Sequence, residues 1–386
     1  MLDAMETAED PMKDLVVIDA DGHVEEHDLT FSDKYLDPAF RAQRPQVVAT
    51  DGLAYWMIEE QLFPRRLGRG CHNLGTPTSY RGTRTLFTQS KPESLESLEL
   101  RDPDARLRDM DAEDLGVAVL YPTLFLAYPL TVNPALSTAL CSAYNRWLAD
   151  AIGESERLRW AAVVNLDEIP AAIRQVREAR ELGAVAVMVL GTAGDRLLDD
   201  PALLPFFEAV AQEELTLSVH VGWACPSLSN LYADLYTATV VPFLTPVLMG
   251  FASVLGSGIL DRFPTMRVAF LEAGCEWLHF MVHRLEHRFH FARSMAKIIP
   301  QTAPRAACPP REYLRRGNLY VSTEVEDTLL PQVIDLVGED HIIFGSDMPH
   351  GDRERFAAKT LLTRTDLSEA AKRKILEENP RRLYRL

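Results

Sequence analysis

The amino-acid sequence predicts an α/β protein, a distorted (β/α)8 barrel (TIM barrel) with an insertion after its first strand. Three observations point to this fold class. Eight short apolar runs recur between Leu15 and Phe344, and helical patterns alternate with them along most of that length. Polar residues follow several runs at their carboxyl ends, which all open on one face of such a barrel. No GxGxxG motif opens any of the helices, which argues against the rival doubly wound open sheet.

The expected strands are short and almost wholly apolar, as strands buried on both faces of a parallel sheet are. The first is the run at residues 15–18. The others are expected at residues 117–121, 160–164, 185–190, 215–220, 267–271, 319–322 and 342–344.

Helical patterns lie between these strands, and proline or a capping residue marks several of their starts. Pro103 opens the first helix, and Ser368 is a suitable N-cap for the last. The helices are expected at residues 102–115, 134–152, 170–182, 201–212, 329–337 and 368–376.

The chain is expected to form one barrel domain over residues 15–386, after an N-terminal tail at residues 1–14. That tail is acidic and lacks the pattern of a secretory signal. Residues 26–100 are rich in Pro, Gly and Arg and sustain no helical or strand period. We interpret them as the insertion, a candidate cover over the active site.

Composition and charge exclude several functional classes. The 386 residues are 47% hydrophobic and 25% charged, as in an ordinary globular protein. A formal net charge of −16 disfavours binding to nucleic acid or to anionic lipid, which both require clustered Lys and Arg. The five cysteines form no CxxC pair, which favours a reduced, cytoplasmic setting.

An uncharged stretch at residues 237–260 is long enough to span a membrane. Pro242, Pro246 and three glycines interrupt it, and it lies between two expected strands. A buried barrel helix or a subunit interface explains it better than a membrane span. We therefore expect no membrane partner and a homodimer.

Four residues at the carboxyl ends of different strands are candidate metal ligands. Asp21 and His23 share one face at the end of the first strand, His220 closes the fifth, and Asp347 follows the eighth. Each has a simpler structural explanation: a turn residue for Asp21, a buried core histidine for His220 and a helix N-cap for Asp347. Together they favour one divalent cation, Zn²⁺ or Mn²⁺, in a mixed nitrogen and oxygen site. No cysteine belongs to the set, so the site is expected to be catalytic.

Other polar residues fall at the same end of the barrel. Glu272 closes the sixth strand, Glu324 follows the seventh, and His350 lies three residues after Asp347. Glu324 and His350 are candidate substrate-binding residues. His279, His283 and His287 recur every four residues along one helix face, where we expect a partly solvated surface rather than a second metal site.

These motifs identify a family resemblance that covers most of the chain. It rests on five segments, residues 17–23, 106–121, 270–274, 344–350 and 378–380. The chain resembles the amidohydrolase-related proteins of the aminocarboxymuconate-semialdehyde decarboxylase type. The resemblance implies a distorted barrel, one divalent metal, and either nonoxidative decarboxylation or metal-assisted hydrolysis. By position, the resemblance implies that the metal ligands are Asp21, His23, His220 and Asp347.

The chain departs from the family pattern at two positions. Asp21-Gly22-His23 stands where many members have His-x-His, which adds an oxygen ligand and favours Mn²⁺ over Zn²⁺. Glu272 stands where many members have a histidine that activates water or contacts substrate. No Lys or Glu ends the fourth strand at residues 188–191, so the bridging ligand of two-metal members is missing and a mononuclear site is expected.

The leading functional hypothesis is a decarboxylase that acts on a small aromatic or unsaturated carboxylic acid. Asp347 or Glu272 would deliver a proton to the carbon that loses CO₂. His220 is a third candidate catalytic residue. Arg81 or Arg84 from the insertion would clamp the substrate carboxylate. The alternatives are a hydrolase that uses a metal-activated water and a noncatalytic binding barrel.

Overall fold

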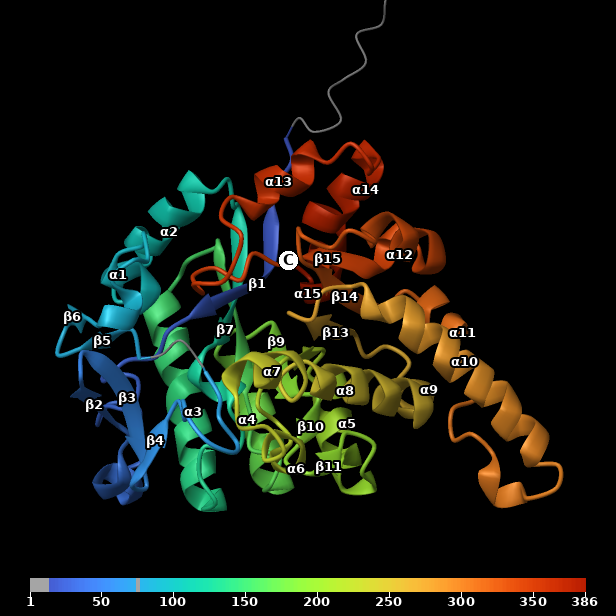
Figure 1. Cartoon of the computed structure of the whole chain (residues 1–386), viewed down its shortest axis with the longest axis horizontal. Coiled ribbons are helices and arrows are strands. Elements are labelled where there is room, and N and C mark those ends of the chain that lie inside the picture. The colour runs from blue at the N-terminus through green and yellow to red at the C-terminus, as the bar shows by residue number, and fades with distance from the viewer. Residues whose placement is uncertain (1–13, 74–76) are drawn as a thin grey trace, which may run out of the picture.

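The central feature of the computed structural model is a barrel of eight parallel strands with helices around it (Figure 1). The structure describes residues 14–73 and 77–386. Neighbouring strands follow one another in the order β1-β7-β8-β9-β12-β13-β14-β15. Their bounds are Ile18–Val24, Val117–Pro122, Leu158–Val163, Ala186–Leu190, Thr216–His220, Val268–Leu271, Leu319–Thr323 and Ile342–Phe344. Each expected strand is present within a few residues of its predicted place, and the (β/α)8 fold class is confirmed.

The barrel closes where β1 meets the segment that follows β15. The Asp19 carboxylate accepts hydrogen bonds from the Ser346 amide at 2.8 Å and the Ser346 hydroxyl at 2.6 Å. Beside it, the Asp347 amide donates to the Asp21 carbonyl at 2.9 Å, and the His23 amide donates to the Met348 carbonyl at 2.6 Å. These bonds join the first and last strands, although the two edges lack a regular ladder.

Most helices of the barrel have a proline in their first two positions, and two of these also have a capping side chain before it. In α3 (Pro134–Ile152) the Asn133 side chain accepts from the Ala135 and Leu136 amides, and in α2 (Pro103–Ala112) Asp102 caps Asp104. The other helices of the barrel are α4 (Ile169–Glu181), α5 (Leu204–Gln212), α8 (Thr245–Gly256), α9 (Ile259–Arg262), α10 (Trp277–Met295), α11 (Pro310–Arg315), α12 (Leu330–Val337), α13 (Ala357–Thr363), α14 (Glu369–Arg373) and α15 (Asn379–Tyr384).

The segment at residues 26–100 contains more regular structure than the sequence predicted. It forms the antiparallel sheet β2 (Gln46–Thr50), β3 (Leu53–Ile58) and β4 (Gln61–Phe63), the hairpin β5 (Ser79–Tyr80) and β6 (Thr83–Arg84), and the short helix α1 (Leu95–Leu98). The expectation of no strand period is wrong for β3. Its buried residues alternate with half-buried ones, but both sets are largely apolar, so the alternation is hidden in the sequence.

The uncharged stretch at residues 237–260 folds mainly as two helices against the barrel. Leu235–Gly256 has the length and hydropathy of a membrane span, yet half of its most apolar window is buried inside the molecule. It is broken into α7 (Leu235–Val240) and α8, and α8 buries Val247, Phe251 and Val254. This arrangement agrees with the buried barrel helix that we expected.

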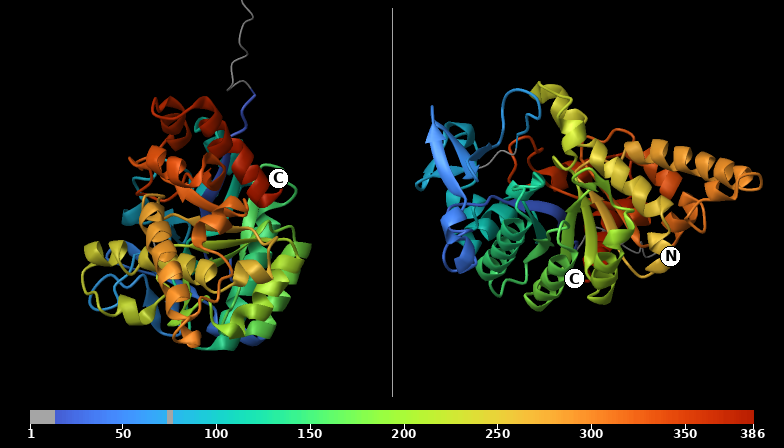
Figure 2. Two further views of the ribbon diagram at one scale, coloured as in Figure 1. Left: turned by 90° about the vertical axis from the view of Figure 1, so that its right-hand side faces the viewer. Right: turned by 90° about the horizontal axis from the view of Figure 1, so that it is seen from below.

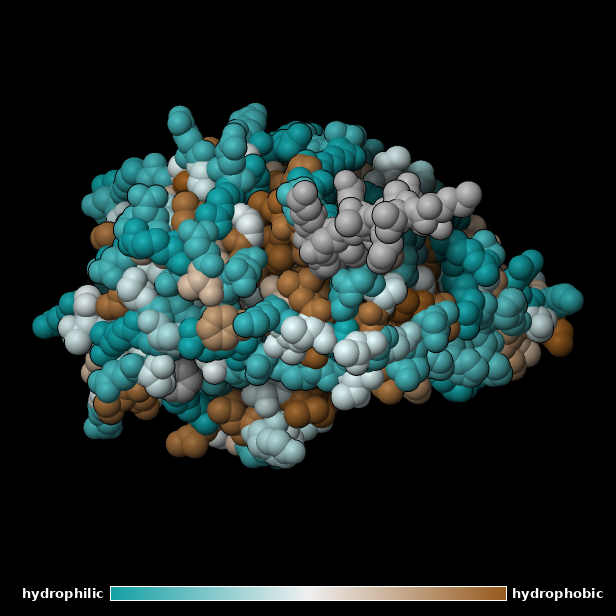
Figure 3. All heavy atoms as spheres, turned by 90° about the horizontal axis from the view of Figure 1, so that it is seen from above, coloured by the Kyte–Doolittle hydropathy of each residue, from teal (hydrophilic) through white to brown (hydrophobic). Residues whose placement is uncertain are grey.

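Helix α10 extends away from the barrel, as Figure 1 and the right-hand view of Figure 2 show. His279, His283 and His287 are exposed on it, as predicted for a solvated helix face. Hydrophilic residues cover most of the face drawn in Figure 3, and hydrophobic residues are scattered among them.

Close approach of α8 to the end of β9 generates a stability prediction. A Cβ atom at Gly191 would lie 1.7 Å from the Pro246 carbonyl oxygen, so Gly191→Ala requires a backbone shift. We expect this variant to lose about 1–3 kcal/mol of unfolding free energy. Gly256→Ala is the matched control, because no atom lies within 4 Å of its Cβ position. It should be neutral or slightly stabilising, since Ala favours a helix over Gly. Urea unfolding of both variants tests the contact, and equal stabilities would contradict it.

Candidate metal centre

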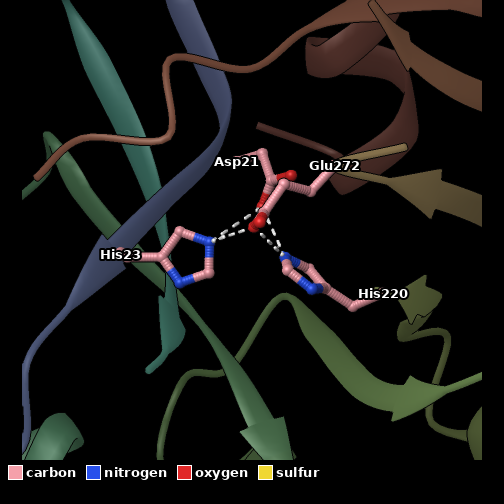
Figure 4. A group of neighbouring side chains, drawn as sticks. All are labelled: Asp21, His23, His220 and Glu272. Carbon is pink, nitrogen blue, oxygen red and sulfur yellow. Dashed lines mark hydrogen bonds and ion pairs between the residues drawn. The ribbon is translucent and has the colours of Figure 1, made fainter. Parts of the chain in front are cut away.

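Four side chains from three neighbouring parts of the barrel converge at its carboxyl-terminal end (Figure 4). Asp21 and His23 lie on β1, His220 ends β12, and Glu272 directly follows β13. His220 Nε2 lies 3.1 Å from Asp21 Oδ1 and 3.4 Å from Glu272 Oε2. His23 Nε2 lies 3.1 Å from the same Glu272 oxygen and 3.6 Å from Asp21 Oδ1. One ligand atom from each residue therefore faces a common centre.

Backbone carbonyls orient both imidazoles toward that centre. His23 Nδ1 lies 3.0 Å from the Pro122 carbonyl oxygen, and His220 Nδ1 lies 3.0 Å from the Val221 carbonyl oxygen. A carbonyl can only accept, so the Nδ1 atoms carry the protons and the Nε2 atoms present lone pairs. This is the tautomer that a metal ligand requires.

Asp347 and His350 extend the same cluster on the β15 side. Asp347 Oδ1 lies 3.5 Å from His23 Nε2 and 2.6 Å from His350 Nδ1. His350 Nε2 lies 2.9 Å from the Thr123 hydroxyl, and the His350 ring lies 4.1 Å from that of His23. Three of the predicted ligands, Asp21, His23 and His220, therefore share one group with Glu272, and Asp347 joins His23 and Glu272 in a second, overlapping group with His350.

Glu272 and Asp347 both adopt left-handed backbone conformations, with φ of 55° and 53°. Such conformations cost non-glycine residues about 1–3 kcal/mol each and occur most often at functional sites. Gly345 allows the approach of this loop to β1, because its Cβ position lies only 2.8 Å from Asp21 Cβ. The backbone therefore places the two carboxylates at a conformational cost.

The charge and hydrogen bonding of the cluster fit a divalent cation. His23 Nε2 and Glu272 Oε2 are buried and have no hydrogen-bond partner. Burial, with Asp347 and Asp21 close by, holds the pKa of Glu272 well above its usual range, and burial raises the pKa of Asp347. Burial lowers the pKa of His23 and keeps its imidazole neutral. A cation at the centre would satisfy the unpaired atoms and relieve the repulsion among the carboxylates.

The two groups of metal-capable side chains in the described part of the chain overlap, since both contain His23 and Glu272. At the end of β9, the backbone of α8 packs directly on Gly191 and excludes a side chain there. The mononuclear site stays a prediction.

A cavity of about 610 Å³ opens beside the centre, within the usual range for small-molecule sites. Its wall includes Asp21, Glu272 and Asp347, together with the predicted substrate-binding residues Glu324 and His350. The insertion contributes described residues that include Ser90 and Lys91, and this position supports the proposal that it covers the active site.

Arg81 and Arg84 are not among the residues that line the cavity. The Arg81 side chain is exposed over the Tyr80 ring, 5.0 Å from its centroid. The Arg84 guanidinium donates to the carbonyls of Thr88 at 3.0 Å and Lys91 at 2.6 Å. The carboxylate clamp predicted for these two arginines therefore has no support in the geometry.

Two buried residues that position the centre were not recognised as site residues from the sequence. Asp19 joins β1 to Ser346, as described above, and Arg106 on α2 is 1% exposed. The Arg106 guanidinium donates to the His23 carbonyl and lies 3.5 Å from the Met348 carbonyl oxygen. It thereby holds together the two chain segments that carry His23 and Asp347. A charged residue on an otherwise ordinary helix gave no signal of this role.

Glu26 is a fully buried carboxyl next to the centre. One of its oxygens accepts from the Leu124 amide at 2.8 Å and the Thr123 amide at 3.3 Å, while Oε1 has no partner. It therefore fixes the turn from which the Thr123 hydroxyl reaches His350. Burial raises the pKa of Glu26 to about 8.

Comparison with known proteins identifies the family. The model of the amidohydrolase family matches residues 18–386, and the chain belongs to that family. Among curated proteins, 2-amino-3-carboxymuconate-6-semialdehyde decarboxylase of Dictyostelium discoideum is 22% identical over 285 residues, which cover 72% of this chain and 75% of the relative. The resemblance found from the sequence motifs is confirmed.

Solved structures confirm the fold. An amidohydrolase from Mycobacterium avium subsp. paratuberculosis has a TM-score of 0.74 and 23% identity, covering 96% of this chain and 98% of that one. The 5-carboxyvanillate decarboxylase of Novosphingobium aromaticivorans with bound manganese has a TM-score of 0.69 and 17% identity, over 97% and 98% of the two chains. The 2,6-dihydroxybenzoate decarboxylase from Rhizobium has a TM-score of 0.60 and 22% identity, over 73% and 88%.

Metal binding should release protons from the cluster. Because burial and the nearby Asp347 and Asp21 raise the pKa of Glu272, its protonated form is favoured in the metal-free protein, and a cation would displace that proton. We expect about one proton released per Zn²⁺ or Mn²⁺ bound to metal-free protein near pH 7. Calorimetric titration in buffers of different ionisation enthalpy measures this number. Glu272→Gln should release fewer protons, and a binding enthalpy that is independent of the buffer in the wild type would contradict the expectation.

The pKa of Glu26 predicts a pH-dependent stability. Its folded-state pKa of about 8 exceeds the ordinary value of 4.5, so the protein is stabilised by protonated Glu26 at low pH and loses that contribution as the pH rises through this window. Glu26→Gln should lose less unfolding free energy between pH 5 and pH 9 than the wild type, by on the order of a few kcal/mol. Urea unfolding at both pH values tests this difference. The control Glu208→Gln changes an exposed residue on α5 and should behave like the wild type. If Glu26→Gln loses as much unfolding free energy between pH 5 and pH 9 as the wild type, Glu26 does not cause the pH dependence.

Proposed function

We propose that this chain is a mononuclear metal-dependent nonoxidative decarboxylase that acts on a small aromatic or unsaturated carboxylic acid. The observation that carries the proposal is the cluster of two imidazoles and three carboxylates, with unpaired buried ligand atoms, beside a cavity of about 610 Å³. The names of the curated relative and of two of the similar structures, all decarboxylases, support the same reaction.

The proposed cofactor is one Zn²⁺ or Mn²⁺ ion held by Asp21, His23, His220 and Asp347, with Glu272 within reach. Two nitrogen and several carboxylate ligands suit these ions better than Ca²⁺ or Mg²⁺. When bound, the cation would orient the substrate carboxylate with an adjacent oxygen and stabilise negative charge that develops during the reaction.

The residues around the centre would supply the proton. When the bond between the carboxyl and the substrate carbon breaks, its electron pair remains on that carbon, CO₂ leaves, and a proton must be added. Asp347 and Glu272 both face the cavity, and whichever of the two does not bind the cation would be free to carry the proton there. His350, 2.6 Å from Asp347 Oδ1, is placed to return a proton to it.

A hydrolase is the second candidate, because Asp347 lines the cavity and its carboxylate, backed by His350, could accept a proton from a water molecule. The third, a noncatalytic binding barrel, leaves the strained backbone and crowded carboxylates unexplained. Labelled water separates the first two, since hydrolysis places ¹⁸O from the solvent in the product and decarboxylation does not.

Two further expectations belong to the proposal. The protein would act as a homodimer, in which the exposed Tyr236 and Val240 beside α8 are available for contact. It would work in the reducing cytoplasm, an expectation consistent with five cysteines that are all free, four of them buried.

The functional test is CO₂ release from a panel of benzoates that carry an ortho hydroxyl, with protein loaded with Zn²⁺ or Mn²⁺. We expect turnover of at least one member and a loss of about 10²-fold or more in Asp347→Asn. Asp335→Asn, an exposed change on α12, should keep full activity. Incorporation of solvent ¹⁸O without CO₂ release would favour the hydrolase, and a fully loaded protein that turns over neither acids nor esters would reject both.

A further inference from the structure

The wall of the cavity carries far more negative than positive charge. Seven Asp and Glu residues line it, and three of them, Asp21, Glu272 and Asp347, belong to the metal centre. The other four, called here the rim carboxylates, are exposed at the mouth on the loops after β14 and β15. They are Glu324, Glu326, Asp352 and Glu354. Within the described ranges, no Lys or Arg forms an ion pair with any rim carboxylate.

The cations in the wall are already neutralised. Lys91 and Arg353 are the lysine and arginine among the described lining residues. Lys91 forms an ion pair with Glu25, which is fully buried. Arg353 binds two other buried carboxylates, Glu113 at 2.6 Å and Glu93 at 2.8 Å. Neither cation is therefore available to a second anionic group of a substrate.

The rim carboxylates lie close enough to the centre to affect it. Asp352 and Glu324 both contribute to the raised pKa of Glu272, after the larger effects of burial, Asp347 and Asp21. Neither Asp352 nor Glu324 has a Lys or Arg ion-pair partner in the described chain to relieve this repulsion.

Part of the wall is apolar. It includes Leu126, Leu244, Trp223 and Phe243, and the last two rings lie 5.3 Å apart. Asp21, Glu272 and Asp347 of the metal centre line the same cavity. The cavity thus combines metal-binding groups, an aromatic surface for a flat apolar group and an acidic rim.

We propose that the substrate is a zwitterion, a carboxylic acid that also carries an ammonium or guanidinium group at the end away from its reacting carboxylate. The carboxylate would lie at the metal centre, the apolar body against Trp223 and Phe243, and the cation at Glu324 and Asp352. A cation there gains both ion pairing with the rim and contact with aromatic rings. The inference rests on the proposed function for the reacting carboxylate only.

Three matched compounds test the inference on metal-loaded protein. They are 2-hydroxybenzoates with an aminomethyl, an ethyl or a carboxymethyl group at position 4, which are cationic, neutral and anionic at that end. Titration calorimetry gives the dissociation constant of each, and CO₂ release gives kcat/KM. We expect the aminomethyl compound to bind about 10-fold more tightly than the ethyl compound, with the carboxymethyl compound weakest.

Variants then locate the effect. In the double variant Glu324→Gln, Asp352→Asn the preference for the cationic compound should fall to about twofold or less, and high salt should reduce it in the wild type. Glu154→Gln removes one charge just before β8, at the opposite end of the barrel, and should keep the full preference. Since the rim residues are exposed, their variants should fold normally, and thermal unfolding checks this.

Binding and turnover separate this inference from the proposed function. Equal or weaker binding of the aminomethyl compound overturns the inference, even if CO₂ is released from all three. A preference that persists unchanged in the double variant also overturns it. Selective binding that depends on the rim supports the inference even where no compound releases CO₂, and in that case only the proposed decarboxylation fails.

Discussion

The junction between β1 and the segment after β15 is the contact on which the site depends. Asp19 and Ser346 are 327 residues apart in sequence and form two hydrogen bonds there. The same two segments carry His23 and Asp347, and the Arg106 guanidinium, which donates to the His23 carbonyl and lies near that of Met348, holds them together. Closing the barrel and assembling the metal centre are therefore one structural event, and a defect in the closure would separate the ligands.

Electrostatic repulsion is the second constraint. The fold places Asp21, Glu272 and Asp347 together in a buried space, two of them with left-handed backbones. Without a cation this arrangement is unfavourable, because burial and the neighbouring carboxylates disfavour the charged form of Glu272 and so raise its pKa. The carboxylates continue from the metal centre to the cavity mouth, and Lys91 and Arg353 are paired with other carboxylates. The same excess of negative charge that favours a bound cation therefore also favours a substrate with a positively charged group.

Strong local patterns made much of this architecture predictable. The eight apolar runs predict the barrel. The positions of Asp21, His23 and His220 at strand ends predict three residues that do share one group, and Asp347 contacts His23 beside it. Glu272 is predicted as a catalytic residue but not as a neighbour of both histidines, because its left-handed backbone leaves no sequence signal. Arg81 and Arg84 were chosen for their charge alone, and long-range contacts such as that of Arg106 have no local pattern at all.

The measurement that tests the central claim most directly is anomalous X-ray diffraction from crystals of the protein loaded with Zn²⁺ or Mn²⁺, with the metal content of the same sample. The account predicts one ion per chain, about 2.0–2.3 Å from His23 Nε2 and His220 Nε2 and bound by carboxylate oxygens from the β1 side and from Asp347 or Glu272. A protein that takes up neither metal, or that holds a second ion at the end of β9 beside Gly191, would contradict it.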